Sequence, residues 1–160
     1  MKAGLLGLAA VYHLLRLTQL ANRSAMDLYV RLALALLCIA FLVREVDIDL
    51  LGESIWWAWA EDMIRIMVGL SILVWYGFLS SKLKVFWAAK SELIHSAVLA
   101  LSFWGCVWYL GSWPFDKMLV VEDASLSALI EIIFELSATV TLCMAAWLPE
   151  QILPDKVWSV

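Results

Sequence analysis

Apolar and polar positions alternate along this chain in long blocks, not in the short periods of a soluble domain. Five mostly apolar stretches of about 17 to 25 residues approach or reach the length that a helix needs to cross the ~30 Å hydrocarbon core of a bilayer. Charged or turn-forming segments separate them. The pattern therefore predicts an all-α polytopic transmembrane helical bundle, a single domain over 1–160 with spans at about 3–20, 27–43, 63–79, 93–113 and 124–148.

The first stretch leaves two arrangements open. Its first ten residues are apolar, whereas His13, Arg16 and Gln19 follow. Such a helix can cross the membrane with Arg16 reaching the far interface, or it can lie along the surface with its polar face in water. We expect a crossing and thus five spans. The alternative is four spans plus an N-terminal interfacial helix.

The segments between the spans carry their own signals. Residues 21–26 form a short polar turn, with Ser24 as the cap of the next helix. Residues 44–62 are expected to be an acidic linker that contains a short surface helix at 46–52. Its tryptophans, Trp56, Trp57 and Trp59, are typical of a membrane interface. Residues 114–123 form another short turn.

Composition supports the membrane class, with 64% hydrophobic and 16% charged residues and a mean hydropathy of +0.89. The net charge is −4 and no basic stripe is present, which argues against nucleic acid as a partner. No small-residue cleavage site follows the first apolar run, so we expect Met1 to begin the working protein. The three cysteines lie inside apolar runs without C-x-x-C spacing and are expected to be buried apolar residues.

The basic residues predict an orientation. With five spans, one side of the membrane receives seven of them and the other side receives four. The richer side should be cytoplasmic, which places the C-terminus inside. The cytoplasmic set is Arg16, Arg23, Arg31, Lys82, Lys84, Lys90 and Lys156, and the outer set is Lys2, Arg44, Arg65 and Lys117.

Two carboxylates inside the last apolar stretch are the main candidate site. Glu131 and Glu135 lie one helical turn apart on a shared face, at a depth of roughly 10 and 16 Å from the start of the stretch. An ionisable side chain there costs at least ~2.5 kcal/mol, so we expect both to face the bundle interior. Arg44 and Arg65 reach the same outer side and are suitable partners, because a guanidinium pairs well with a carboxylate. We interpret the four residues as a pocket for a proton or a small ligand.

Two other interpretations of the glutamates stay open. They could form a buried structural ion pair that sets the helix register, or they could contact a partner subunit.

Other candidate sites are weaker. Glu45, Asp47, Asp49 and Asp116 could form an acidic site on the outer face, although a solvated charged turn is favoured over a cation site. The sequence predicts no metal site and no cofactor. A haem between His13 and His95 is disfavoured, because lone histidines are more often satisfied by a local hydrogen bond.

Four short runs resemble a family of small polytopic bacterial inner-membrane proteins to which no chemistry has been assigned. The runs are LVREVDIDLLG, KVFWAAKSELI, GSWPFD and IEIIFELSA, and the chain has Ile132 where a second adjacent acid is expected. The resemblance implies a bacterial inner-membrane setting. It also implies a role for Arg44, Glu45, Asp47, Asp49, Asp116, Glu131 and Glu135.

These observations favour a non-enzymatic function. We expect a small-ligand or proton-binding protein, or an accessory subunit, with the lipid bilayer and other membrane subunits or further copies of the chain as partners. The alternative is a lipid-modifying or quinone-linked membrane enzyme that uses Glu131 and Glu135 as acid and base.

Overall fold

The computed structural model describes residues 2–19, 25–46, 55–88, 90–117, 119–120 and 123–148. Within these residues all regular structure is helical, as the sequence predicts. Seven helices follow one another: α1 (Lys2–Gln19), α2 (Ala25–Glu45), α3 (Ile55–Ser80), α4 (Leu83–Ala88), α5 (Lys90–His95), α6 (Ala97–Asp116) and α7 (Ala124–Trp147).

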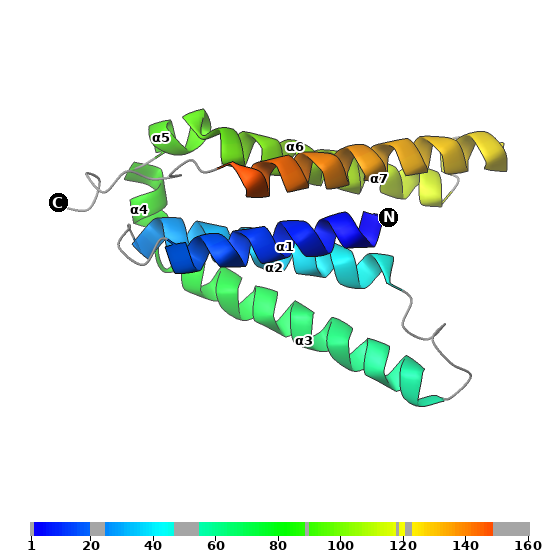
Figure 1. Ribbon diagram of the computed structural model, residues 1–160, viewed down its shortest axis with the longest axis horizontal. Coiled ribbons are helices and arrows are strands. Elements are labelled where there is room, and N and C mark those ends of the chain that lie inside the picture. The colour runs from blue at the N-terminus through cyan, green and yellow to red at the C-terminus, as the bar shows by residue number, and fades with distance from the viewer. Residues whose placement is uncertain are drawn as a thin grey trace.

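The five long helices form three layers (Figure 1). The antiparallel pair α6 and α7 lies on one side, the antiparallel pair α1 and α2 lies in the middle, and α3 packs against α2 on the other side. Helices α1 and α7 run in the same direction, since Lys2 contacts Glu135 and Tyr12 stacks on Trp147. Towards the N-terminal end of α1, α3 diverges from α2, and α6 and α7 extend beyond the middle pair (Figure 1).

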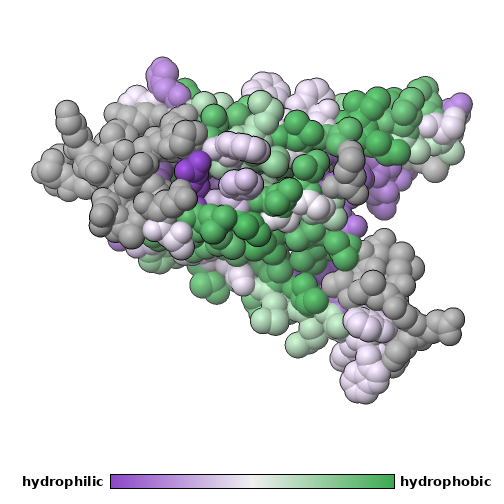
Figure 2. Space-filling view, viewed as in Figure 1, coloured by the Kyte–Doolittle hydropathy of each residue, from purple (hydrophilic) through white to green (hydrophobic). Residues whose placement is uncertain are grey.

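In the part of the chain that the structure describes, three helices, not five, are long and apolar enough to cross a membrane: Trp56–Ser80 of α3, Ala97–Asp116 and Ala124–Trp147. The expected five spans therefore need correction. The uninterrupted apolar runs of α1 and α2 are 3–12 and 32–43, which reach only about 15 and 18 Å at 1.5 Å per residue. Charged side chains at both ends of these helices limit their apolar length. Apolar side chains cover most of the visible face of the molecule (Figure 2).

Several expected boundaries also differ. The linker expected at 44–62 is too long, because α3 begins at Ile55 and includes all three tryptophans of the cluster. No proline or glycine interrupts residues 55–62, and Glu61 pairs with Arg65 one turn later, so the helix starts early. The surface helix expected at 46–52 lies outside the described residues except for Val46, and so does the Ser24 cap.

The fourth expected span, 93–113, is divided. Helix α5 ends at His95, and the side chain of Ser96 accepts a hydrogen bond from the Leu99 amide and caps α6. At its other end α6 continues through Pro114 to Asp116, so the turn expected at 114–123 is shorter.

The start of α7 has a well-formed cap in Asp123. Its exposed carboxylate accepts hydrogen bonds from the Ser125 hydroxyl at 2.6 Å and from the amides of Ser125 and Leu126 at 2.9 and 3.2 Å. These bonds, above all the one from the Ser125 side chain, hold the pKa of Asp123 below its usual value. The cap sets the first turn of α7 and hence the position of the glutamates along it.

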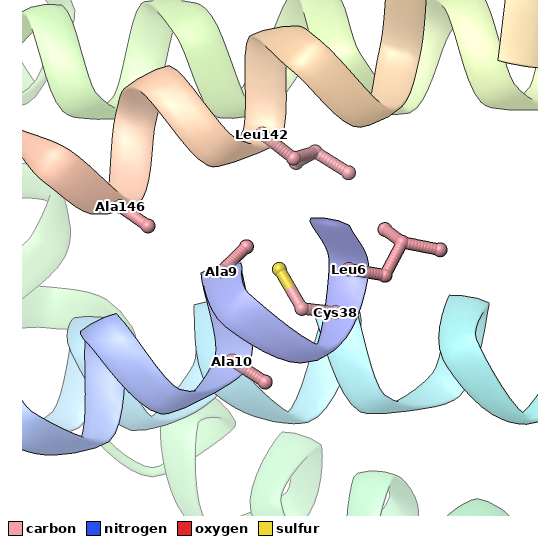
Figure 3. Packing of buried hydrophobic residues seen from close by; sticks show 6 residues of the cluster. All are labelled: Leu6, Ala9, Ala10, Cys38, Leu142 and Ala146. Atoms are coloured by element: carbon pink, nitrogen blue, oxygen red, sulfur yellow. The ribbon is translucent and has the colours of Figure 1, made fainter. Parts of the chain in front are cut away.

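Small residues allow the layers to approach closely. Leu6, Ala9 and Ala10 of α1 meet Cys38 of α2, and α7 contributes Leu142 and Ala146 to the same cluster (Figure 3). Cys38 is buried as expected, whereas Cys106 and Cys143 are half-buried, and all three are free thiols. Small side chains at helix interfaces permit the van der Waals packing that replaces the hydrophobic effect in lipid.

Gly105 of α6 lies at a close approach to α7. A Cβ atom there would lie 2.7 Å from Leu142 Cγ and 3.3 Å from the Ala138 carbonyl oxygen. Gly105→Ala should therefore force the two helices apart and lower the stability by ~1–3 kcal/mol, which thermal unfolding in mild detergent can measure. Gly77→Ala is the control, because nothing lies within 4 Å of a Cβ at that position. Equal unfolding temperatures for Gly105→Ala and the parent would contradict this packing.

Candidate functional site

A cluster of charged side chains lies where α1, α2 and α7 meet. Lys2, in the first turn of α1, forms ion pairs with Glu135 of α7 and with Glu45 at the end of α2. The Lys2 Nζ to Glu45 Oε2 distance is 3.2 Å. One ammonium group therefore links carboxylates from two other helices.

Arg44 and Tyr109 complete the cluster. Arg44 Nη2 lies 3.9 Å from Glu135 Oε1, and its guanidinium carbon is 4.8 Å from the centroid of the Tyr109 ring. The Tyr109 hydroxyl donates a hydrogen bond of 2.8 Å to Glu45 Oε1 and lies 3.3 Å from the Phe41 carbonyl oxygen. The Phe41 ring stacks on Tyr109 with 3.9 Å between centroids. Each side chain in the cluster thus has more than one partner.

The carboxylates are covered, whereas the bases are partly open. The exposed fraction of the side chain is 5% for Glu135 and 11% for Glu45, but 30% for Lys2 and 39% for Arg44. Charges removed from water must be paired, because their attraction has to offset a large desolvation cost. The same pattern means that anything approaching the carboxylates would first meet Lys2 or Arg44.

The stagger of the helices brings these residues together. Antiparallel packing sets the start of α1 beside the end of α2, so Lys2 meets Glu45. Because α7 extends past both, Lys2 meets α7 at Glu135, roughly 17 Å from the start of that helix at 1.5 Å per residue. Tyr109 reaches the same place from α6. The cluster therefore lies near the middle of a helix that is long enough to cross a membrane.

The structure joins some of the predicted site residues and separates others. Glu135 and Arg44 do meet. Glu131 is half-buried one turn earlier on α7 and lies within electrostatic range of Glu135, Lys2 and Arg44. Arg65 instead pairs with Glu61 of its own helix.

Arg65 and Arg44 meet at a separate feature, a groove of about 430 Å³ between α2 and α3. The groove is otherwise apolar. Its lining consists of Ala40, Val43, Arg44, Arg65, Val68, Gly69 and Ile72. Arg44 thus stands between this groove and the charged cluster.

The acidic site expected on the outer face is divided as well. Glu45 belongs to the charged cluster, whereas Asp116 is half-buried at the end of α6, 3.0 Å from the ammonium of Lys117. Asp47 and Asp49 lie outside the described residues. In the described part of the chain, no three His, Cys, Asp or Glu side chains lie close enough together to hold a metal ion.

Sequence reasoning missed Lys2 and Tyr109. Lys2 was considered only in the count of basic residues. A single lysine directly before an apolar run could have been recognised as a possible partner for a carboxylate deep in another helix. Tyr109 carried no such signal, because a tyrosine among the tryptophans of 104–113 resembles an interfacial aromatic.

A second set of polar contacts joins α1, α2 and α7 at the opposite end of the bundle. Arg31 of α2 is buried and its Nη2 donates a hydrogen bond of 3.1 Å to the Leu148 carbonyl, and Arg16 Nη2 of α1 donates one of 3.3 Å to the Trp147 carbonyl. These cations face the last carbonyl groups of α7, where the helix dipole is negative. His13 is fully buried near Arg31, while His95 is exposed and bonds the Ser91 carbonyl of its own helix. The two histidines thus occupy different environments.

Comparison of this chain with protein-family models, curated proteins and solved structures gives no match. The resemblance to bacterial inner-membrane proteins therefore stays a prediction, and the geometry of the cluster carries the functional argument.

A double-mutant cycle can test the central ion pair. Lys2→Gln and Glu135→Gln should each destabilise the protein, and the double variant should lose less than the sum of both. We expect an interaction free energy of ~0.5–3 kcal/mol from thermal unfolding in mild detergent. The pair of the exposed Lys117 and the half-buried Asp116 is the control, and its cycle should give a value near the ~0–1 kcal/mol of surface pairs. Additive losses at Lys2 and Glu135 would show that the two side chains do not interact.

Proposed function

We propose that this chain is a small bacterial inner-membrane protein that binds a proton or a small cation at the cluster of Lys2, Arg44, Glu45, Tyr109 and Glu135. It acts alone or as an accessory subunit of a larger membrane assembly. The observation that carries the proposal is the sharing of one partly exposed lysine by two covered carboxylates.

The charge balance favours a positive ligand. Three carboxylates, those of Glu45, Glu131 and Glu135, share the two bases Lys2 and Arg44. A fourth, Asp116, also lies within electrostatic range of Glu131 but is paired with Lys117. One negative charge is therefore left over in an apolar bundle, where uncompensated charge is expensive. Binding one proton or one small cation neutralises it. A purely structural pair would need one acid and one base only.

The arrangement also suggests how proton or cation binding changes the packing of the helices. When Glu135 binds a proton, its attraction for Lys2 weakens, and the ammonium can pair with Glu45 alone. Since Lys2 opens α1, Glu45 ends α2 and Glu135 lies on α7, the change alters contacts between three helices. The site thereby couples charge to helix packing.

The distribution of basic residues supports the proposed orientation. Arg16, Arg31 and the lysines of α4 and α5 lie at one end of the bundle, whereas Lys2, Arg44 and Lys117 belong to helix ends at the other. Arg65 lies further along α3, in the groove that Arg44 also lines. By the positive-inside rule the first end faces the cytoplasm. Helix α7 ends on that side, and the charged cluster lies in the half of the bundle towards the outside.

The exposure of α3 supports the accessory-subunit version. In the most apolar 18-residue stretch of α3, no residue is buried within this chain. Lipid or a neighbouring subunit would have to cover this surface in a membrane.

Proton binding can be measured directly. We expect infrared difference spectra of the protein in lipid nanodiscs, recorded between acidic and neutral pH, to show a carboxylic acid band. The band should be lost or shifted in Glu135→Gln and Glu131→Gln, because both remove part of the negative charge that the proton neutralises. Asp62→Asn is the control and should leave the band unchanged, since that carboxylate is exposed on α3.

Repeating the spectra with added sodium, potassium or magnesium ions separates a proton from a cation as the ligand. A cation that binds at the cluster should shift the carboxylate bands in the parent and not in Glu135→Gln. The proposal fails if no band responds to pH or to ions, or if the response persists in both glutamine variants.

A further inference from the structure

The segment between α3 and α6 does not continue either long helix. Helices α4 and α5 cross the end of the bundle, from the α3 side to the α6 side (Figure 1). Their inner side is anchored, because Phe86 and Leu93 pack against the cluster of Val30, Leu34 and Val98. We call the exposed side of residues 82–94 the basic platform.

The basic platform combines positive charge with large apolar side chains. From residue 82 to residue 94 the sequence has three lysines and one acid, Glu92. Lys82, Lys84 and Lys90 are exposed. The exposed fractions of Leu83, Trp87 and Ile94 are 54%, 69% and 75%. A surface in water has no reason to expose such residues together, whereas a membrane interface accepts both kinds.

A shallow groove on the platform has the chemistry of a lipid site. It has a volume of about 230 Å³ and is lined by Leu83, Phe86, Trp87 and Lys90. Lys90 Nζ lies 5.7 Å from the centroid of the Trp87 ring, so the ammonium is held above the edge of an apolar floor. The acyl carbons of a lipid would pack on this apolar surface, and its phosphate would lie beside the Lys90 ammonium.

The position along the bundle agrees with this. The platform follows the end of α3 and precedes the start of α6, and both helices are long and apolar enough to cross a membrane. A segment that joins two such helices across the end of the bundle lies at the level of the headgroups.

We propose that the basic platform binds an anionic phospholipid of the surrounding leaflet, with its phosphate at Lys90 and its upper acyl chain against Leu83 and Trp87. Lys82 and Lys84 add to the attraction. The inference does not depend on the charged cluster, which belongs to the other end of α1 and α2.

Lipid binding to the full-length chain in mild detergent tests the proposal. Native mass spectrometry should show tighter binding of phosphatidylglycerol than of phosphatidylcholine with the same acyl chains. Lys90→Gln should weaken phosphatidylglycerol binding roughly fivefold, and the triple change of Lys82, Lys84 and Lys90 to Gln should weaken it at least about tenfold. Lys117→Gln is the matched control, an exposed lysine at the other end of the bundle, and should bind as the parent does.

Two further arms identify the occupant. Trp87→Ala should weaken both lipids, because it removes the apolar floor, and inorganic phosphate should not displace the lipid. Equal binding of the two lipids, or full lipid selectivity in Lys90→Gln and in the triple variant, would overturn the proposal. Displacement by inorganic phosphate, or unchanged binding in Trp87→Ala, would overturn it as well. Thermal unfolding of each variant confirms that it is folded, and Lys90→Gln, an exposed single change, keeps the test decisive if the triple variant does not fold.

Discussion

The structure depends on one ammonium group that holds two carboxylates in an apolar bundle. Lys2 contacts Glu135 of α7 and Glu45 of α2, so it ties its own helix to two others. Apolar packing alone allows one helix to shift along another, since one leucine can take the place of another at little cost in free energy. A buried charge does not, because any shift that separates it from its partner leaves it desolvated and unpaired. We infer that this pair sets the stagger of α1 against α7.

Helices α1, α2 and α7 have to pack closely in the middle of the bundle for that pair to form. Cys38, Leu142 and several alanines allow α1, α2 and α7 to pack closely between the charged cluster and the arginines at the other end (Figure 3). Arg16 and Arg31 then reach the last carbonyl groups of α7. Helices α1, α2 and α7 are thus held by charge at both ends and by small side chains between. By contrast α3, which packs against α2, diverges from it towards the end of α2 (Figure 1).

Two kinds of site follow from one distribution of charge. At the end where α1 begins, acids outnumber bases inside the bundle, which suits a proton or a small cation. At the other end lysines gather on the outside of α4 and α5, which suits the phosphates of a membrane surface. The two proposed sites differ because the first is enclosed by helices, whereas the second lies on the exposed side of α4 and α5.

The sequence alone determined the helical class of the chain and singled out Glu135 as an acid within a long apolar block. A carboxylate deep in such a block needs a partner of opposite charge, and Arg44 Nη2 lies 3.9 Å from it. Only the tertiary structure decided that Lys2, Glu45 and Tyr109 lie in one cluster with Glu135 and that Arg65 does not. It also showed that α1 and α2 lack the apolar length of the other three long helices. The physical reason is that a residue's depth and helicity depend on its neighbours in sequence. The charges that it meets depend on how far one helix is shifted along another, and no single stretch of sequence contains that shift. Close packing at small residues such as Gly105 and Ala9 lets the helices come near enough for those charges to pair.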